Sequence, residues 1–145
     1  MTIRRHASAS ERGSRRVVLL VEDEPFVREA TCCILQSAGF DVLPAADAQE
    51  AMKVYEQNGG RIDVLMTDMV LPGRSGPQLG RDLRNTSPEI PILLTSGYLQ
   101  PESGPEPREP RTHYLAKPYS RADLVQKMET ILSAARLRRA ATQAH

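Results

Sequence analysis

Carboxylates, hydroxyl groups and a lysine follow directly after apolar runs along this 145-residue chain. In chain order they are Glu22, Asp23 and Glu24, then Asp68, then Thr95 and Ser96, and finally Lys117. Converging carboxylates repel one another unless a cation joins them, and a site made of oxygen ligands suits Mg²⁺ better than zinc. Such a site can hold a phosphoryl group, with lysine and hydroxyl donors on the phosphate oxygens. Taken singly, each group is explained as a cap, a turn or a loop. Together they favour phosphoryl-transfer chemistry.

The elements that would position these groups are apolar runs of strand length, which alternate with amphipathic stretches of helical length. Pro25 and Gly39 bound the first helix, Asp47 with Glu50 starts the second, and Ser120 caps the last. This alternation predicts a doubly wound α/β fold with a parallel sheet covered on both faces. Ligands collect at the carboxyl ends of such strands, where all these groups stand. Strands are expected at 16–21, 40–45, 62–69, 90–97 and 113–119, and helices at 25–38, 47–58, 76–85 and 120–137.

Residues 98–112 interrupt the alternation where a fourth helix is due. Four prolines fall within residues 101–110. A proline in a helix interior costs about 3 kcal/mol. We therefore expect the helix between the fourth and fifth strands to be truncated or replaced by a mobile, partly polyproline-like loop.

Charge and composition narrow the classes of protein. The net charge is +1, but residues 1–16 carry +4 and residues 133–145 carry +3, which leaves −6 on the residues between. An acidic body argues against direct DNA binding, and the sequence has no apolar run of membrane-spanning length. The two cysteines, Cys32 and Cys33, are adjacent and imply no structural disulfide, which fits a cytoplasmic protein. We expect a basic disordered tail at 1–15, one folded domain at 16–133, and a helix end with a basic tail at 134–145.

Four motifs together carry a resemblance to a known family. "VEDEP", "MTDMVLPGRSG", "LLTSGY" and "YLAKPY" lie at the ends of the expected strands one, three, four and five. With them the chain resembles a bacterial response-regulator receiver domain over residues 16–132, and its last two motifs are similar to those of receivers attached to hybrid histidine kinases. The resemblance implies a flavodoxin-like strand order 2-1-3-4-5. It also implies a phosphoprotein of two-component signal transduction.

The resemblance assigns roles at the site. Asp68 is the expected phosphoryl acceptor, and Ser96 and Lys117 are expected to contact the phosphoryl group. The peptide from Lys117 to Pro118 is expected to be cis. The expected cofactor is Mg²⁺, with Mn²⁺ as a substitute. Its implied ligands are Glu22 (mostly through a water), Asp23, Asp68 and the backbone carbonyl of Val70.

Further positions concern signalling and the lifetime of the phosphoryl group. By the resemblance, Ser96 and Tyr114 form the switch, while Pro72 and Gly76 shape the loop after Asp68. Val70 offers no side chain to orient water and Tyr98 is large enough to shield the phosphate, so we expect slow self-dephosphorylation. Glu24 is left over and is expected only to start the first helix.

The resemblance implies a protein that catalyses its own phosphorylation rather than a conventional enzyme. Its expected partners are a sensor histidine kinase or histidine phosphotransfer protein and a downstream protein target. The initiator Met and the tails favour a complete, stand-alone receiver over an excised one. A phosphorelay intermediate or phosphate sink stays open as an alternative. A phosphorylation-independent scaffold and an Asp-nucleophile phosphatase are weaker alternatives, since the phosphatase needs a second Asp where this chain has Val70.

Overall fold

Five parallel strands form one sheet in the order β2-β1-β3-β4-β5. The structure is a computed structural model that describes residues 15–97 and 110–143. Its strands are β1 (Val17–Val21), β2 (Asp41–Ala45), β3 (Val64–Asp68), β4 (Ile92–Ser96) and β5 (Thr112–Ala116). Its helices are α2 (Pro25–Ser37), α3 (Ala48–Gln57), α4 (Gly76–Thr86) and α5 (Arg121–Gln143). The predicted doubly wound α/β fold and its strand order are confirmed.

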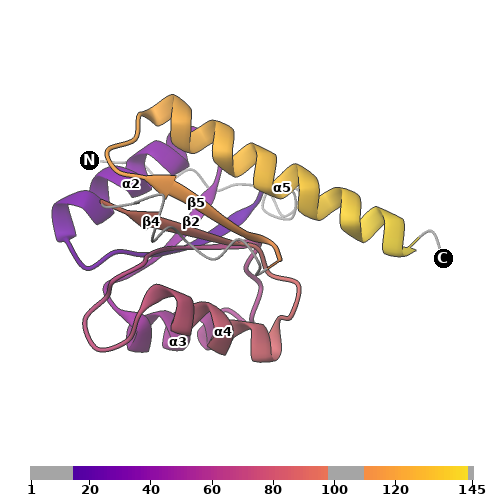
Figure 1. Ribbon diagram of the computed structural model, residues 1–145, viewed down its shortest axis with the longest axis horizontal. Helices are drawn as coiled ribbons and strands as arrows, with labels where there is room; N and C mark the ends of the chain where they lie inside the picture. Colours follow the sequence, from indigo (N-terminus) through magenta and orange to yellow (C-terminus); the bar gives the residue numbers. More distant parts are fainter. Residues whose placement is uncertain (1–14, 98–109, 144–145) are drawn as a thin grey trace, which may run out of the picture.

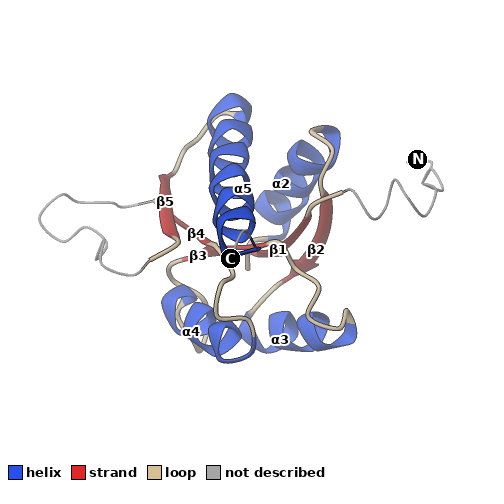
Figure 2. Cartoon of the chain, turned by 90° about the vertical axis from the view of Figure 1, so that its right-hand side faces the viewer, coloured by secondary structure: helices blue, strands red, loops and turns tan. Residues whose placement is uncertain are grey.

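The helices cover both faces of the sheet. Figures 1 and 2 show α2 and α5 on one face and α3 and α4 on the other. Side chains alternate along each strand, so β1 sends Leu19 to the α3/α4 face and Val18 and Leu20 to the α2/α5 face. Each face therefore has its own apolar core, as expected for a parallel sheet buried on both sides.

Local sequence explains where the helices begin. The Asp47 carboxylate accepts a hydrogen bond from the Glu50 amide at 2.8 Å, as its position before α3 predicts. Ser75 and Gln78 form a capping box at the start of α4. The Ser120 hydroxyl accepts a bond from the Asp123 amide before α5. These caps fix the loops that leave the carboxyl ends of the strands.

The C-terminal helix is longer than the sequence predicted. We expected it to end near residue 137, but α5 continues to Gln143 and projects beyond the sheet. Its buried stripe from Leu124 continues through Leu132 to Ala135, and alanine and arginine, both good helix formers, follow. No helix in the described part of the chain is both long enough and apolar enough to span a bilayer.

The expected proline-rich loop in place of a helix between β4 and β5 falls mainly on residues 98–109, which lie outside the described residues. The same is true of most of the N-terminal tail. Both stay predictions.

Candidate functional site

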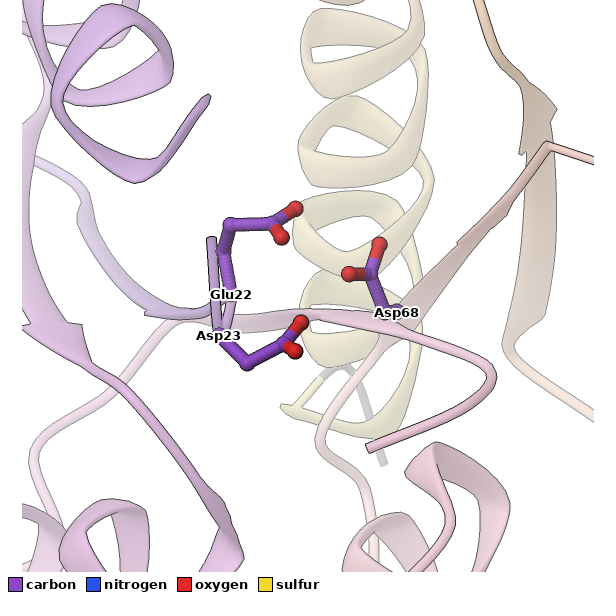
Figure 3. A group of neighbouring side chains, drawn as sticks. All are labelled: Glu22, Asp23 and Asp68. Carbon is purple, nitrogen blue, oxygen red and sulfur yellow. The ribbon is translucent and has the colours of Figure 1, made fainter. Parts of the chain in front are cut away.

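Three carboxylates converge where β1 and β3 end. Figure 3 shows Glu22 and Asp23, just after β1, turned toward Asp68 at the end of β3. Each offers an oxygen within 4.8 Å of the others. They meet because β1 and β3 are adjacent parallel strands in register, with Val21 opposite Thr67. The carboxylates that the sequence placed at separate strand ends are therefore brought together.

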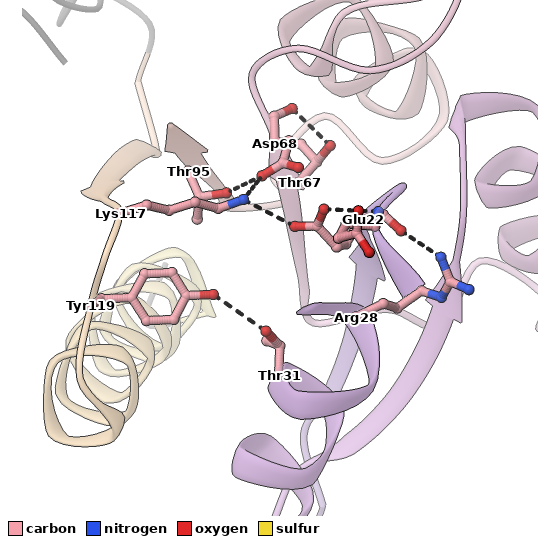
Figure 4. A network of polar contacts seen from close by, with 9 residues as sticks. Glu22, Arg28, Thr31, Thr67, Asp68, Thr95, Lys117 and Tyr119 are labelled. Carbon is pink, nitrogen blue, oxygen red and sulfur yellow. Dashed lines mark hydrogen bonds and ion pairs between the residues drawn. The ribbon is translucent and has the colours of Figure 1, made fainter. Parts of the chain in front are cut away.

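Lys117, just after β5, joins two of these carboxylates. Its ammonium group lies 2.8 Å from Asp68 Oδ1 and donates to Glu22 Oε1 at 3.1 Å (Figure 4). Its own amide donates to the Ser96 carbonyl at 2.8 Å, which holds the start of this loop against β4. The peptide from Lys117 to Pro118 is cis, as predicted.

Asp68 has a second donor on the same oxygen. The Thr95 hydroxyl on β4 donates to Asp68 Oδ1 at 2.7 Å (Figure 4). Thr95 stands directly opposite Asp68 in the register of β3 and β4, and its residue is only 2% exposed. Asp68 Oδ1 is thus contacted by the short, buried side chain of Thr95 and by the long, partly buried side chain of Lys117.

Burial and charge shift the pKa values at this edge of the sheet. Burial raises the pKa of Glu22, although the Glu24 amide and Lys117 oppose this, and the neighbouring Asp68 raises it further. For Lys117, burial favours the neutral amine, but its bonds to Asp68 and Glu22 outweigh this and raise the pKa of the ammonium group. Lys117 therefore stays protonated beside carboxylates that repel one another.

The residues present fit a divalent cation. The three clustered groups are oxygen ligands of the kind that Mg²⁺ prefers, and their mutual repulsion is only partly offset by Lys117. Glu22 is 5% exposed, whereas Asp23 is open to solvent, so the cluster is reached from one side. This donor set is suited to Mg²⁺ and lacks the nitrogen and sulfur ligands typical of zinc.

The loop after β3 is fixed against the backbone of Asp68. The Gly76 amide donates to the Met69 carbonyl at 2.9 Å, and the Thr67 hydroxyl donates to the Asp68 carbonyl at 3.0 Å. A Cβ atom on Gly76 would lie 2.1 Å from that same Asp68 carbonyl oxygen. The first residue of α4 must therefore be glycine in this arrangement, which gives the predicted role of Gly76 a steric basis.

Two contacts from α2 tie this helix to the backbone and the loop beside the carboxylates. Arg28 donates from its guanidinium group to the Glu22 carbonyl at 2.7 Å. The hydroxyls of Thr31 and Tyr119 lie 3.4 Å apart, which links α2 to the loop that carries Lys117 (Figure 4). Glu24 caps α2 with its backbone in an extended conformation and without a side-chain cap bond, consistent with the minor role expected for it.

The structure describes three of the other predicted site residues, and their roles stay predictions. Ser96 is the last residue of β4, directly after Thr95. The Val70 side chain is exposed in the loop after β3, and Tyr114 packs partly buried against the α3/α4 core. Tyr98 lies outside the described residues.

Sequence reasoning missed Thr95 as a contact of Asp68. The "LLTSGY" motif offered two adjacent hydroxyls, and the resemblance directed attention to Ser96. The signal that could have found Thr95 is the alternation of side chains along a strand. Residues directly opposite each other on adjacent strands, such as Thr95 and Asp68, have their side chains on the same face of the sheet. Arg28 and Tyr119 gave no comparable sequence signal.

Comparison with known proteins yields one family and several relatives. The family described as "Response regulator receiver domain" matches residues 18–129. The sensor kinase CckA of Brucella abortus is 36% identical over 125 residues, which are 86% of this chain but only 13% of that kinase. The crystal structure of the receiver domain from hybrid histidine kinase CckA is 34% identical, with a TM-score of 0.70 over 80% of this chain and 98% of that chain. The response regulator TrrA of Thermotoga maritima, solved in complex with Mg(2+)-BeF, is 25% identical, with a TM-score of 0.69 over 81% of this chain and 99% of that one.

Proposed function

Because the chain belongs to the response regulator receiver domain family of two-component signalling, we propose that it accepts a phosphoryl group on Asp68 and relays the signal by protein contact. The observation that carries this proposal is the setting of the Asp68 carboxylate. It ends a buried strand, faces two other carboxylates, and has an ammonium group at 2.8 Å. A carboxylate placed in this way can act as a nucleophile toward phosphorus.

The chain's own residues have distinct tasks in this reaction. One Asp68 oxygen attacks the phosphorus atom in line with the leaving atom, which is the imidazole nitrogen of a phosphohistidine or the carboxylate oxygen of a small acyl phosphate. The bond from phosphorus to that atom breaks, and an aspartyl phosphate results. Lys117, already charged, neutralises the phosphoryl oxygens. Ser96 is proposed to donate a hydrogen bond to them. The β3–α4 loop, fixed by Gly76, holds the Asp68 backbone in place for the attack.

A divalent cation belongs to this proposal. Glu22, Asp23, Asp68 and the Val70 carbonyl would hold Mg²⁺, or Mn²⁺ in its place, with Glu22 acting mostly through a water. When bound, the ion neutralises negative charge that builds up between the carboxylates and the phosphoryl oxygens. The support for this is the convergence of three carboxylates within 4.8 Å.

The proposed partners are a sensor histidine kinase or a histidine phosphotransfer protein on the input side and a protein target on the output side. The likeness to a receiver domain from a hybrid histidine kinase supports this choice of donor. Tyr114 and Ser96 are proposed as the switch that alters the surface around β4 and β5. Val70 and Tyr98 are proposed to slow the loss of the phosphoryl group.

Intact-mass spectrometry after incubation with acetyl phosphate tests the proposal. The wild type should gain a single phosphoryl adduct with Mg²⁺ and much less without it. Asp68→Asn should gain none. The matched control is Asp82→Asn, which changes a partly exposed aspartate on α4 that pairs with Arg74 and should leave the adduct intact. An undiminished adduct on Asp68→Asn would contradict the assignment.

A further inference from the structure

Asp68 Oδ1 lies within hydrogen-bond distance of two donors that differ in length and in burial, and this difference bears on the lifetime of the phosphoryl group. Thr95 Oγ1 lies 2.7 Å from Oδ1 and Lys117 Nζ lies 2.8 Å from it. Thr95 is 2% exposed, has a short β-branched side chain, and lies opposite Asp68 on β4, an inner strand of the sheet. The Lys117 side chain is 27% exposed, and its ammonium group lies at the end of a flexible four-carbon chain.

The two donors should therefore behave differently once a phosphoryl group is attached to Asp68. Lys117 can turn toward the new phosphoryl oxygens because its stem is long and partly solvated. Thr95 cannot follow, since a β-branched side chain in a strand has few rotamers and its neighbours are packed. Thr95 should therefore keep its hydrogen bond to the Asp68 side-chain oxygen after Lys117 has moved.

We propose that the Thr95 hydroxyl is a catalytic group for loss of the phosphoryl group from Asp68, because it stabilises the carboxylate that leaves. The proposal rests on the proposed function of Asp68 as phosphoacceptor. It assigns to Thr95 a contact with the aspartyl oxygen, distinct from the contact with the phosphoryl group proposed for Ser96.

The chemical step is a hydrolysis. Water attacks phosphorus, the bond between phosphorus and the Asp68 oxygen breaks, and its electron pair returns to Asp68 as a carboxylate. Both protons of the attacking water leave with the inorganic phosphate, as H₂PO₄⁻. In the aspartyl phosphate, Thr95 donates to a neutral acyl oxygen; in the loose transition state, it donates to a group that is becoming an anion.

The hydrogen bond therefore strengthens along the reaction. Bonds to a charged acceptor are about twice as strong as bonds between neutral groups. A preorganised donor aimed at developing charge lowers the barrier. The effect of Thr95 on the rate of phosphoryl uptake should be small. In a loose transition state the attacking carboxylate keeps most of its charge, and so keeps its hydrogen bond to Thr95. Thr95 should thus affect the rate of loss far more than the rate of uptake.

Two variants separate this role from a structural one. Thr95→Val keeps the shape and removes the hydroxyl, while Thr95→Ser keeps the hydroxyl and removes a methyl group. Each is phosphorylated with acetyl phosphate and Mg²⁺, freed of the donor by rapid desalting, and followed by intact mass. Uptake is measured separately from the early growth of the adduct.

Thr95→Val should lengthen the half-life of the adduct on the order of fivefold, and should change its rate of uptake by a smaller factor. Thr95→Ser should lie near the wild type in both rates. An unchanged or shortened half-life in Thr95→Val would overturn the role of Thr95 while leaving Asp68 as acceptor. If the wild type itself takes up no phosphoryl group, the proposed function fails and the role of Thr95 with it.

Discussion

Replacing Gly76 with alanine should damage both the fold and the phosphoacceptor, because one glycine separates helix α4 from the Asp68 backbone. The added Cβ would lie 2.1 Å from the Asp68 carbonyl oxygen and 3.1 Å from the Thr67 methyl group. Real Cβ atoms essentially never approach another heavy atom so closely. Either the start of α4 or the end of β3 must move by about an ångström to reach an ordinary contact.

The size of the effect follows from what must move. Overpacking of a close-packed interior costs about 1–3 kcal/mol, and here the obstacle is backbone rather than a flexible side chain, so we expect about 3 kcal/mol lower free energy of unfolding. A misplacement of about 1 Å at a reacting group can cost on the order of 10²-fold in rate. The rate of phosphoryl uptake at Asp68 should therefore fall by about that factor.

Gly80→Ala is the matched control on the same helix. Its Cβ would meet the Ile92 Cδ1 atom at 2.6 Å, but this is a terminal methyl group, which rotation about χ2 can move while the β-branched part of the side chain and the strand stay in place. Alanine in place of an interior helical glycine also recovers up to about 1 kcal/mol. Urea unfolding and acetyl phosphate kinetics of both variants test the contrast. Equal stability and equal uptake in Gly76→Ala and Gly80→Ala would refute the steric argument.

Three further predictions concern charge at and near the site. Mg²⁺ should raise the melting temperature of the wild type, with a gain of about 1.4 kcal/mol at ten times the dissociation constant, and Asp23→Asn should abolish most of the rise in a thermal scan. Lys117→Met should lower the free energy of unfolding at pH 7 by about 3 kcal/mol in metal-free urea titrations, because the buried Glu22 loses its partner; a loss below about 1 kcal/mol would contradict this. His113 should make stability fall as the pH drops below about 6.5, so His113→Gln should show a flatter pH profile between pH 7 and 5. Burial and three cations lower the pKa of His113 in the folded state, so the unfolded chain binds the proton more readily; the cations are Lys127, Arg138 and Arg84.

Much of the fold could be predicted because apolar runs of strand length and amphipathic stretches of helical length alternate clearly along the sequence. Runs such as Val17–Val21 are apolar at every position and so predict strands covered on both faces, which the two cores confirm. Caps such as Asp47 are local, so their neighbours in sequence are enough to find them. The end of α5 could not be placed, since alanine and arginine continue a helix without an apolar stripe to mark where packing stops.

The site, too, has features that the sequence predicts and features that it does not. The clustering of Glu22, Asp23 and Asp68 could be predicted, because parallel strands end at the same edge. The contact from Thr95 depends on the register between β3 and β4, a relation between strands that no single stretch of sequence specifies. The clash at Gly76 likewise depends on how closely α4 approaches β3.

The central claim is that Asp68 itself receives the phosphoryl group. The most direct measurement is borohydride trapping of the wild type after acetyl phosphate and Mg²⁺, followed by peptide mass spectrometry. Borohydride reduces an acyl phosphate to an alcohol, so the account predicts conversion of residue 68 to homoserine, with Glu22 and Asp23 unchanged. Conversion at another carboxylate, with residue 68 intact, would contradict it.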